Sequence, residues 1–137
     1  MNYVYDVSFV GPLIIPDEKN SRVEKTHAGI AEDECIYVPQ LFWYEVSNLF
    51  KNLMRRKRYT HEGVIPFYRP LAAIRLTCDY ATGIDYSKKL LRLCGEYNLS
   101  SYDAAYLELA ERKNAALCTL DEDLRLAAKK YGVSVIK

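Results

Sequence analysis

The chain has 137 residues, of which half are hydrophobic and 27% are charged. This length and composition predict a single domain over residues 1–137 with a packed core, and they exclude a globally disordered chain. Nineteen basic residues against eighteen acidic ones give a formal net charge of +1. Any affinity for nucleic acid must therefore come from local patches or metal ions, because the chain lacks a strongly basic overall field.

The sequence carries no membrane or secretion signal. Its apolar runs are far shorter than the roughly 18 to 20 residues that a bilayer span needs. The N-terminal stretch MNYVYDVSFVGPLIIPDE has no early positive cluster and places an acid at position 6, so we expect the first strand of a mature protein. The four cysteines, at positions 35, 78, 94 and 118, form no CxxC pair and lie in apolar segments. They predict buried thiols in a reducing cytoplasm, with neither a disulfide framework nor a zinc site. The short apolar runs predict no membrane partner.

The first element is a β-rich run over residues 2–7 that ends at an acid. Gly11, Pro12 and Pro16 are expected to break the chain after it. Residues 19–31 then carry enough charge for an exposed helix.

A second strand and a long helix follow. Residues 35–38 (CIYV) form a short apolar run that Pro39 stops, which predicts a buried strand. Residues 40–58 have helical periodicity and end in the basic cluster 55–58, where positive charge suits a helix C-terminus. Residues 40–54 contain more apolar side chains than one buried face requires. This surplus predicts a groove for a helix or strand of a partner protein, or part of a homodimer contact.

The second half of the chain begins with a helical stretch that Pro66 and Pro70 interrupt. The remaining elements are, in chain order, a strand over 74–78, a helix over 84–97, a helix over 101–113 capped by Ser100 or Ser101, a strand over 115–119, a helix over 121–131 ended by Gly132, and a strand over 133–136. Because strands alternate with helices, we predict an α/β fold with three layers, α/β/α, around a central parallel sheet.

Four carboxylates occupy related places in this pattern. Asp6 ends the first strand, Glu45 lies early in the helix after the second strand, Asp103 is in the first turn of a helix, and Asp121 follows the strand that ends at Thr119. In an open parallel sheet, the ends of strands and the starts of the following helices meet in the crevice outside the strands' C-terminal ends. The sequence therefore predicts several acids in one pocket.

Clustered carboxylates repel each other unless a cation holds them. A set of oxygen ligands without paired His or Cys suits Mg²⁺ or Mn²⁺ better than zinc. Such ions can activate water and stabilise the leaving oxygen in phosphodiester hydrolysis.

Each acid also has a structural interpretation. Asp103 lies three residues after Ser100, as in a capping box, and Asp121 can be a helix N-cap. Asp6 can simply end a strand at a turn. Glu45 is the hardest to explain in this way, because its neighbours in LFWYEVSNLF are aromatic and apolar, and an ionised Glu is rarely buried without a partner.

Four segments resemble the PIN-domain family, and within it the VapC-type toxins of toxin–antitoxin pairs. YVYDVS resembles the opening strand with the first acid, Asp6, followed by the small polar residue Ser8, and VPQLFWYEVSNLF resembles the segment with the second acid, Glu45. LSSYDAAYLELAERKNAALCTLDEDL matches the signature DA-x-Y-x-x-LA followed by T-x-D, and GVSVI resembles the final strand.

The resemblance implies that Asp103 is the third acid and Asp121 the fourth, with Thr119 as a polar helper. Asp123 lies close enough in sequence to compete as the fourth acid, but Asp121 holds the T-x-D position. The resemblance further implies a Mg²⁺- or Mn²⁺-dependent endoribonuclease that acts on RNA, an antitoxin protein that blocks the site, and a homodimer.

Two other functions fit less well. A non-catalytic PIN-like interaction module would not need the intact set of acids. A phosphoryl-transfer α/β domain of the haloacid-dehalogenase type would need an acid two residues after Asp6, where this chain has Ser8. A receiver domain would need paired acids at the end of its first strand and a late lysine, and the sequence has neither.

Overall fold

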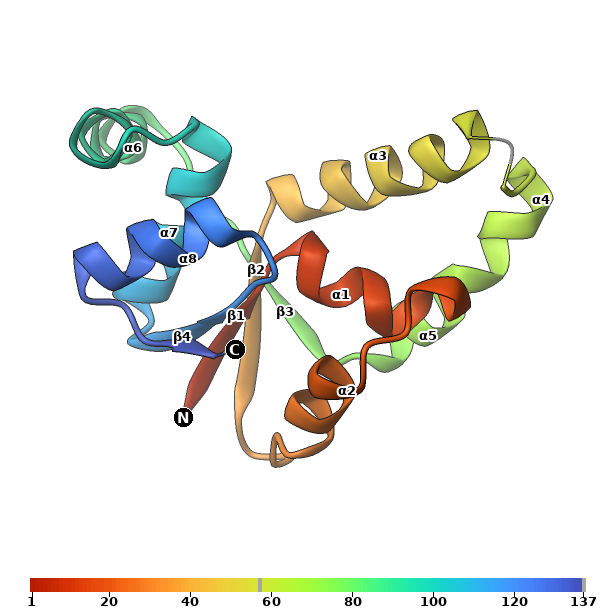
Figure 1. Ribbon diagram of the computed structural model, residues 1–137. Coiled ribbons are helices and arrows are strands. Elements are labelled where there is room, and N and C mark those ends of the chain that lie inside the picture. The colour runs from red at the N-terminus through yellow and green to blue at the C-terminus, as the bar shows by residue number, and fades with distance from the viewer. Residues whose placement is uncertain (57, 137) are drawn as a thin grey trace.

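The computed structural model describes residues 1–56 and 58–136, and its centre is a parallel five-stranded sheet (Figure 1). The strands are β1 (Asn2–Tyr5), β2 (Cys35–Pro39), β3 (Leu76–Asp79), β4 (Ala115–Cys118) and β5 (Val135–Ile136). Their order across the sheet is β3-β2-β1-β4-β5, and each neighbouring pair is parallel. The central strand β1 pairs on both sides, with Tyr3 opposite Ile36 on β2 and Ala116 on β4.

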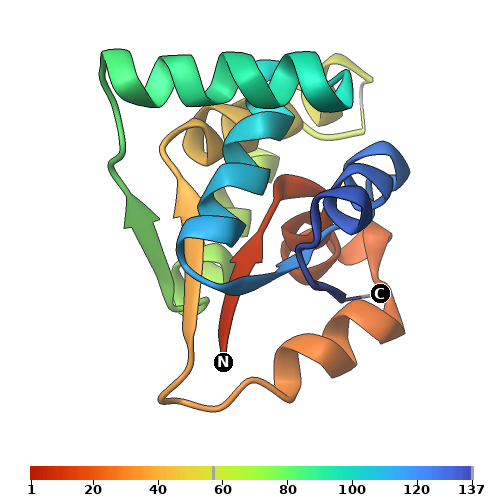
Figure 2. The same cartoon turned by 90° about the vertical axis from the view of Figure 1, so that its left-hand side faces the viewer.

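Helices cover both faces of the sheet, as predicted. The helices are α1 (Val7–Ile14), α2 (Ser21–Ala28), α3 (Leu41–Arg55), α4 (His61–Val64), α5 (Tyr68–Ala73), α6 (Ile84–Tyr97), α7 (Ser101–Arg112) and α8 (Glu122–Tyr131), with short 3-10 turns at Pro16–Glu18 and Ile65–Phe67. One core contains residues of α1 to α5, and the other contains residues of α6, α7 and α8. Figure 2 shows α7 crossing one face of the sheet.

The alternation of side chains along the strands explains the two cores. Tyr5 and Ile36 point into the core under α1 to α5, whereas Val4 and Leu117 point into the core under α6 to α8. All four side chains are at most 3% exposed. Burial on both faces is typical of parallel sheets, and it explains why the strands are short apolar runs.

The prediction that Gly11 and Pro12 break the chain is wrong, because both lie inside α1. Pro12 has no N–H to donate to the Ser8 carbonyl, which normally disfavours a helix. Here the Asp6 carboxylate caps the helix through the Phe9 N–H. Burial of the α1 side chains in the core offsets the lost hydrogen bond. The first strand accordingly ends at Tyr5, one residue before the acid.

Other predicted boundaries shift by a few residues. The long helix ends at Arg55, and Lys57 of the predicted basic cluster lies outside the described residues. The cysteines are unbridged, and Cys118 is buried, but Cys35 is exposed because it begins β2 after an exposed turn. Within residues 1–56 and 58–136, no helix is long and apolar enough to cross a membrane.

A hydrogen bond between Tyr5 on β1 and His27 on α2 connects helix α2 to the sheet. The hydroxyl of fully buried Tyr5 forms a 2.8 Å hydrogen bond with Nδ1 of His27. Burial lowers the pKa of His27, and the charge of Arg75 lowers it further. Folding thus favours the neutral ring of His27. This preference contributes fully to the stability above the pKa of the unfolded state, which is about 6.5. The contribution is lost as pH falls through the lower pKa of the folded state.

We therefore expect the free energy of unfolding to fall between pH 7.5 and 5.5 in the wild type by more than in His27→Gln. The difference approaches about 1.4 kcal/mol for each unit of pKa shift. Urea unfolding at the two pH values measures it, with the exposed His61 in His61→Gln as the control. Equal pH dependence of the wild type and His27→Gln would show that His27 does not couple protonation to folding.

Candidate active site

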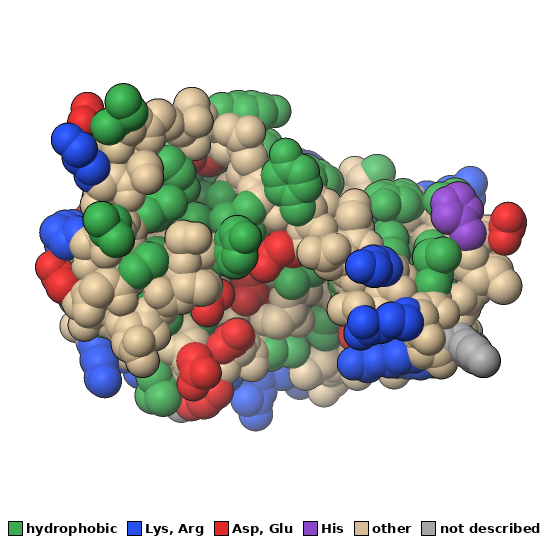
Figure 3. Space-filling view, turned by 90° about the horizontal axis from the view of Figure 1, so that it is seen from above, with side chains coloured by type: hydrophobic (Ala, Val, Ile, Leu, Met, Phe, Trp, Pro, Cys, Tyr) green, Lys and Arg blue, Asp and Glu red, His purple; other side chains and the backbone are tan. Residues whose placement is uncertain are grey.

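Four segments meet at the C-terminal edge of the sheet. They are the turn from β1 into α1, the first turns of α3 and α7, and the turn from β4 into α8. The Asp6 N–H donates to the Cys118 carbonyl over 3.3 Å, which joins the first and last of these turns. Figure 3 looks onto this edge and shows acidic side chains gathered around a hollow.

Asp6 is the most buried acid of this group, at 5% exposure. One carboxylate oxygen accepts hydrogen bonds from the Ser8 hydroxyl (2.7 Å) and the Phe9 N–H (3.1 Å), and the other accepts from the Thr119 hydroxyl. Burial raises the pKa of Asp6, although these three hydrogen bonds act against it, and the charge of Asp121 raises it slightly more. The side chain is therefore rigidly held and carries its charge at an energetic cost.

The two predicted polar helpers lie between the turns and hold them together. The Ser8 hydroxyl accepts from the Leu120 N–H (2.8 Å), and the Thr119 hydroxyl accepts from the Asp121 N–H (3.0 Å). The two hydroxyl oxygens are 3.2 Å apart. Ser8 and Thr119 therefore fix Asp6 relative to the start of α8.

Glu45 is half-buried on α3, and its carboxylate accepts a hydrogen bond from the hydroxyl of Tyr106 on α7. Burial raises the pKa of Glu45, the Tyr106 hydrogen bond lowers it, and the charges of Asp6 and Asp103 raise it. Tyr106 is 1% exposed, so it packs in the core and also positions Glu45. Its position one helical turn after Asp103 was the only sequence signal for this second role.

Asp103 and Asp121 each belong to a helix start. The predicted cap is Ser100, whose hydroxyl accepts from the Asp103 N–H at 3.2 Å. Burial raises the pKa of Asp103, and the charges of Asp121 and Asp123 raise it further. Asp121 is exposed and is itself the N-cap of α8, because its carboxylate accepts from the Leu124 N–H at 3.1 Å. Asp123 is exposed, and with Asp103 it lines a cavity of about 520 Å³.

The acids are coupled in a continuous series by charge repulsion. The charge of Asp121 raises the pKa of both Asp6 and Asp103, whereas the charge of Asp123 raises that of Asp103. Among the described residues, Lys and Arg form no ion pair with these five acids. Asp6, Glu45 and Asp103 are buried or half-buried carboxylates without a basic partner in the described part of the chain, which is the setting in which a cation is most favourable.

The donor set fits a hard divalent cation, because it consists of carboxylate and hydroxyl oxygens. In the conformation described, no three His, Cys, Asp or Glu side chains among residues 1–56 and 58–136 are arranged to ligate one ion. In this conformation Tyr106 donates a hydrogen bond to the Glu45 carboxylate, and the Asp121 carboxylate caps α8. The four predicted acids therefore lie along one edge of the sheet, but they do not share one pocket: Asp103 lines the cavity that Asp123 also lines, and Glu45 lines another hollow.

Sequence reasoning also missed a second polar cluster beside the site. Glu108 on α7 is 2% exposed, and its carboxylate binds Arg112 and Lys89. Arg112 also forms two hydrogen bonds with Asp79 at the end of β3, at 2.9 and 2.7 Å. Alternating charged and apolar residues in YLELAER gave no sign that one acid would be buried.

Comparison with known proteins agrees with this architecture. The family model described as "PIN domain" matches residues 3–130. Ribonuclease VapC3 of Pyrobaculum aerophilum is 25% identical over 124 residues, which cover 90% of this chain and 92% of that protein. The crystal structure of PAE2754 from Pyrobaculum aerophilum superposes with a TM-score of 0.67 at 21% identity and covers 98% of this chain and 92% of that one.

A toxin–antitoxin complex from Klebsiella pneumoniae contains a chain with a TM-score of 0.63 at 17% identity, covering 98% of this chain and 96% of the other. At these identities the two structures show a common fold. The family match extends from β1 to the end of α8, and it includes all four acids predicted from the sequence. The chain therefore belongs to the PIN domain family.

Proposed function

We propose that this protein is a divalent-metal-dependent endoribonuclease and the toxin of a toxin–antitoxin pair. The observation that carries the proposal is the series of acids at the sheet edge, where Asp6, Glu45 and Asp103 have raised pKa values and no Lys or Arg partner among the described residues. Family membership and the relative named as a ribonuclease support RNA as the substrate.

In this proposal Asp6, Glu45, Asp103 and Asp121 hold Mg²⁺ or Mn²⁺. When bound, such an ion lowers the pKa of water and offsets negative charge on the phosphodiester oxygens. Asp6 provides the fixed ligand because Ser8, Phe9 and Thr119 hold both of its oxygens in place. Tyr106 orients Glu45 and keeps it more acidic than burial alone would allow.

Partner binding is the second part of the proposal. The toxin–antitoxin complex from Klebsiella pneumoniae, which shares this fold, supports an antitoxin as a partner of this chain. The surplus of apolar side chains that the sequence predicts on α3 includes Trp43 and Tyr44, which are 43% and 74% exposed. Trp43 borders an apolar hollow of about 380 Å³ together with α5 residues, which is a suitable surface for an antitoxin helix. A homodimer and a cytoplasmic location remain predictions.

The direct test is cleavage of single-stranded RNA by the purified protein. We expect cleavage with Mg²⁺ or Mn²⁺ and none with excess EDTA, and mapping the 5′ ends of the fragments identifies the sites. Co-expression with the antitoxin, which we expect to be encoded beside this protein, should suppress cleavage. Undiminished cleavage in EDTA, or none in any divalent ion, would reject the proposed activity.

The fourth acid is tested by comparing Asp121→Asn with Asp123→Asn. Asparagine keeps an oxygen to cap α8, so Asp121→Asn removes repulsion without removing the cap. We expect Asp121→Asn to melt higher than the wild type in EDTA. Mn²⁺ should stabilise the wild type by about 2.7 kcal/mol at a hundredfold excess over Kd, and Asp121→Asn by less. Asp123→Asn should keep the wild-type response to Mn²⁺.

Thermal melts in EDTA and in Mn²⁺ measure both effects. If Asp121→Asn melts lower in EDTA and Mn²⁺ shifts it as much as the wild type, Asp121 is only a helix cap. If Asp123→Asn alone loses the Mn²⁺ response, Asp123 is the fourth acid. Because the folded pKa values of Asp6, Glu45 and Asp103 are raised, stability in EDTA should also rise as pH falls through them, and level off below about 4.

A further inference from the structure

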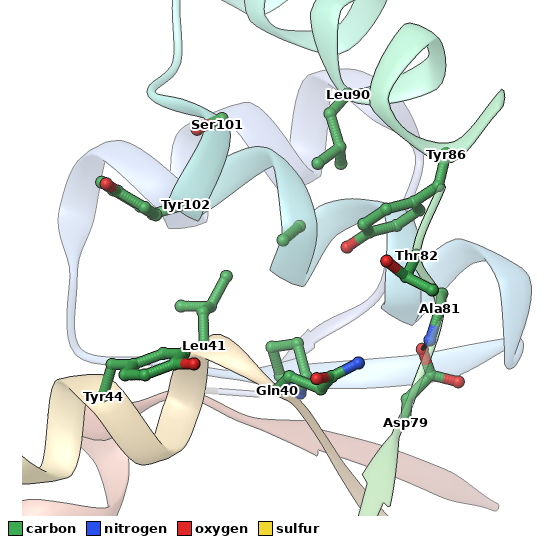
Figure 4. Close-up of a pocket in the computed structure, with 12 residues that line it drawn as sticks. Gln40, Leu41, Tyr44, Asp79, Ala81, Thr82, Tyr86, Leu90, Ser101 and Tyr102 are labelled. Carbon is green, nitrogen blue, oxygen red and sulfur yellow. Dashed lines mark hydrogen bonds between the residues drawn. The ribbon is translucent and has the colours of Figure 1, made fainter. Parts of the chain in front are cut away.

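A cavity of about 290 Å³ lies beside the acids, between the start of α3, the loop after β3, and helices α6 and α7 (Figure 4). Its size is near the lower end of the roughly 300 to 1,000 Å³ that small-ligand pockets occupy. The residues that matter for its chemistry are Gln40, Tyr44, Thr82, Tyr86 and Tyr102. Such a cavity can hold one small ring system.

The cavity adjoins a hollow that Glu45, one of the four candidate acids, lines. A neighbouring hollow is lined by Leu41, Tyr44, Glu45, Asn48 and Tyr102. The two hollows share Leu41, Tyr44 and Tyr102, so one depression runs from Glu45 past both tyrosines. The α3 residues lie at i, i+3, i+4 and i+7 and therefore share one helix face, which places an aromatic ring beside the candidate metal ligand.

Two tyrosine rings border the depression and are open to solvent. Tyr44 on α3 is 74% exposed, and Tyr102 on α7 is 64% exposed. Figure 4 shows them on two different helices at the same end of the cavity. Exposed aromatic rings along a groove are the groups on which the bases of single-stranded nucleic acids stack.

The opposite end of the cavity is polar and carries no basic residue. Figure 4 shows the hydroxyls of Thr82 and Tyr86 on the same side of the cavity, with the Gln40 amide below them. Within the part of the chain that the structure describes, these three side chains form no hydrogen bond with another side chain. The Asp79 carboxylate in the wall is engaged by Arg112 and by the Ala81 N–H.

This lining distinguishes between ligand classes. A phosphate would meet a carboxylate and no Lys or Arg, so the cavity disfavours it. A neutral heteroaromatic base would stack on the rings and exchange hydrogen bonds with the free amide and hydroxyls. We propose that this cavity binds one unpaired base of the RNA, in a nucleotide next to the cleaved phosphate. Tyr44 and Tyr102 stack on it, and Gln40, Thr82 and Tyr86 select it.

The inference rests on the proposed ribonuclease function, and it names the form of RNA that is recognised. Its test uses a short single-stranded RNA with one mapped cleavage site. The double variant Tyr44→Ala/Tyr102→Ala should raise KM roughly tenfold or more, with kcat nearly unchanged, because stacking contributes to binding. Tyr80→Ala is the matched control, since Tyr80 is 72% exposed and lies outside both cavity linings.

An RNA that lacks the base beside the cleaved bond completes the experiment. The wild type should show the same rise in KM with this RNA, and the double variant should show no further rise, because both changes remove one contact. Gln40→Ala should change the preferred base at that position alone.

Three results would overturn the inference. The double variant could match Tyr80→Ala, or the missing base could raise KM by the same factor in the double variant and in the wild type. Alternatively, the double variant could bind RNA normally and lose only antitoxin binding, which would assign the rings to a protein contact. In all three, wild-type cleavage survives and the proposed function stands. A wild type that cleaves no RNA with Mg²⁺ or Mn²⁺ would reject both the proposed function and the base-binding cavity.

Discussion

Asp6→Asn is expected to lower the rate of metal-dependent RNA cleavage by at least about 100-fold. Loss of a residue that only supports a metal ligand already costs up to about 100-fold, and Asp6 is proposed to be a ligand itself. The substitution removes the negative charge while keeping the size of the side chain and an oxygen that can accept from the Phe9 N–H. Because the buried charge of Asp6 is costly in the metal-free protein, the variant should also melt at or above the wild-type temperature in EDTA.

The matched control is Asp33→Asn, which changes an exposed acid in the loop before β2. It should cleave at the wild-type rate. Single-turnover cleavage of a labelled RNA, with circular dichroism of each variant, separates lost chemistry from lost folding. A folded Asp6→Asn protein that cleaves within a few-fold of the wild type would remove Asp6 from the site.

Arg112→Met is expected to destabilise the protein by about 3 kcal/mol, and it leaves the four candidate metal ligands unchanged. The change leaves the carboxylate of Glu108, which is 2% exposed, with Lys89 as its remaining cation at 3.3 Å. It also removes both hydrogen bonds to Asp79, which hold the pKa of that carboxyl below its usual range. The expected loss of stability is at the low end of the range for a broken buried ion pair, because Lys89 still contacts the Glu108 carboxylate.

Two further variants make this prediction specific. Arg92→Met breaks an exposed ion pair with Glu96 on α6, and such pairs contribute about 0 to 1 kcal/mol. Adding Glu108→Leu to Arg112→Met should recover part of the loss, because the uncompensated charge is gone. Urea unfolding measures all of them. A loss in Arg112→Met no larger than in Arg92→Met would show that Glu108 does not depend on Arg112.

The strands β2 and β4 were predictable because their side chains are largely buried. The run at 35–38 is apolar throughout, the run at 115–119 is apolar up to Thr119, and the structure has strands at Cys35–Pro39 and Ala115–Cys118. Helix ends were predictable where side-chain chemistry defines them, as at Ser100 and Gly132. Helix α1 was not, since local propensity disfavours Pro12 and tertiary burial decides the outcome.

The positions of the acids were predictable from the rule that parallel strands bring their C-terminal ends to one edge. Their side-chain conformations were not, because these depend on partners that are distant in sequence. Tyr106 lies 61 residues from Glu45, and Thr119 lies 113 residues from Asp6. Asp121 could be assigned as a cap or as an acid of the site, and its contact with the Leu124 N–H shows that the cap is present in the structure.

The central claim is that these acids bind a divalent ion, and the loss of the free Mn²⁺ signal in electron paramagnetic resonance tests it most directly. Titrating Mn²⁺ into the wild type should suppress the signal of free Mn²⁺ until the site is filled, and Mg²⁺ should restore it by competition. Asp6→Asn/Asp103→Asn, which lacks two of the charges, should leave the signal nearly that of Mn²⁺ in buffer. Equal free Mn²⁺ in the wild type and the double variant, across the range that supports RNA cleavage, would contradict a metal site at this edge of the sheet.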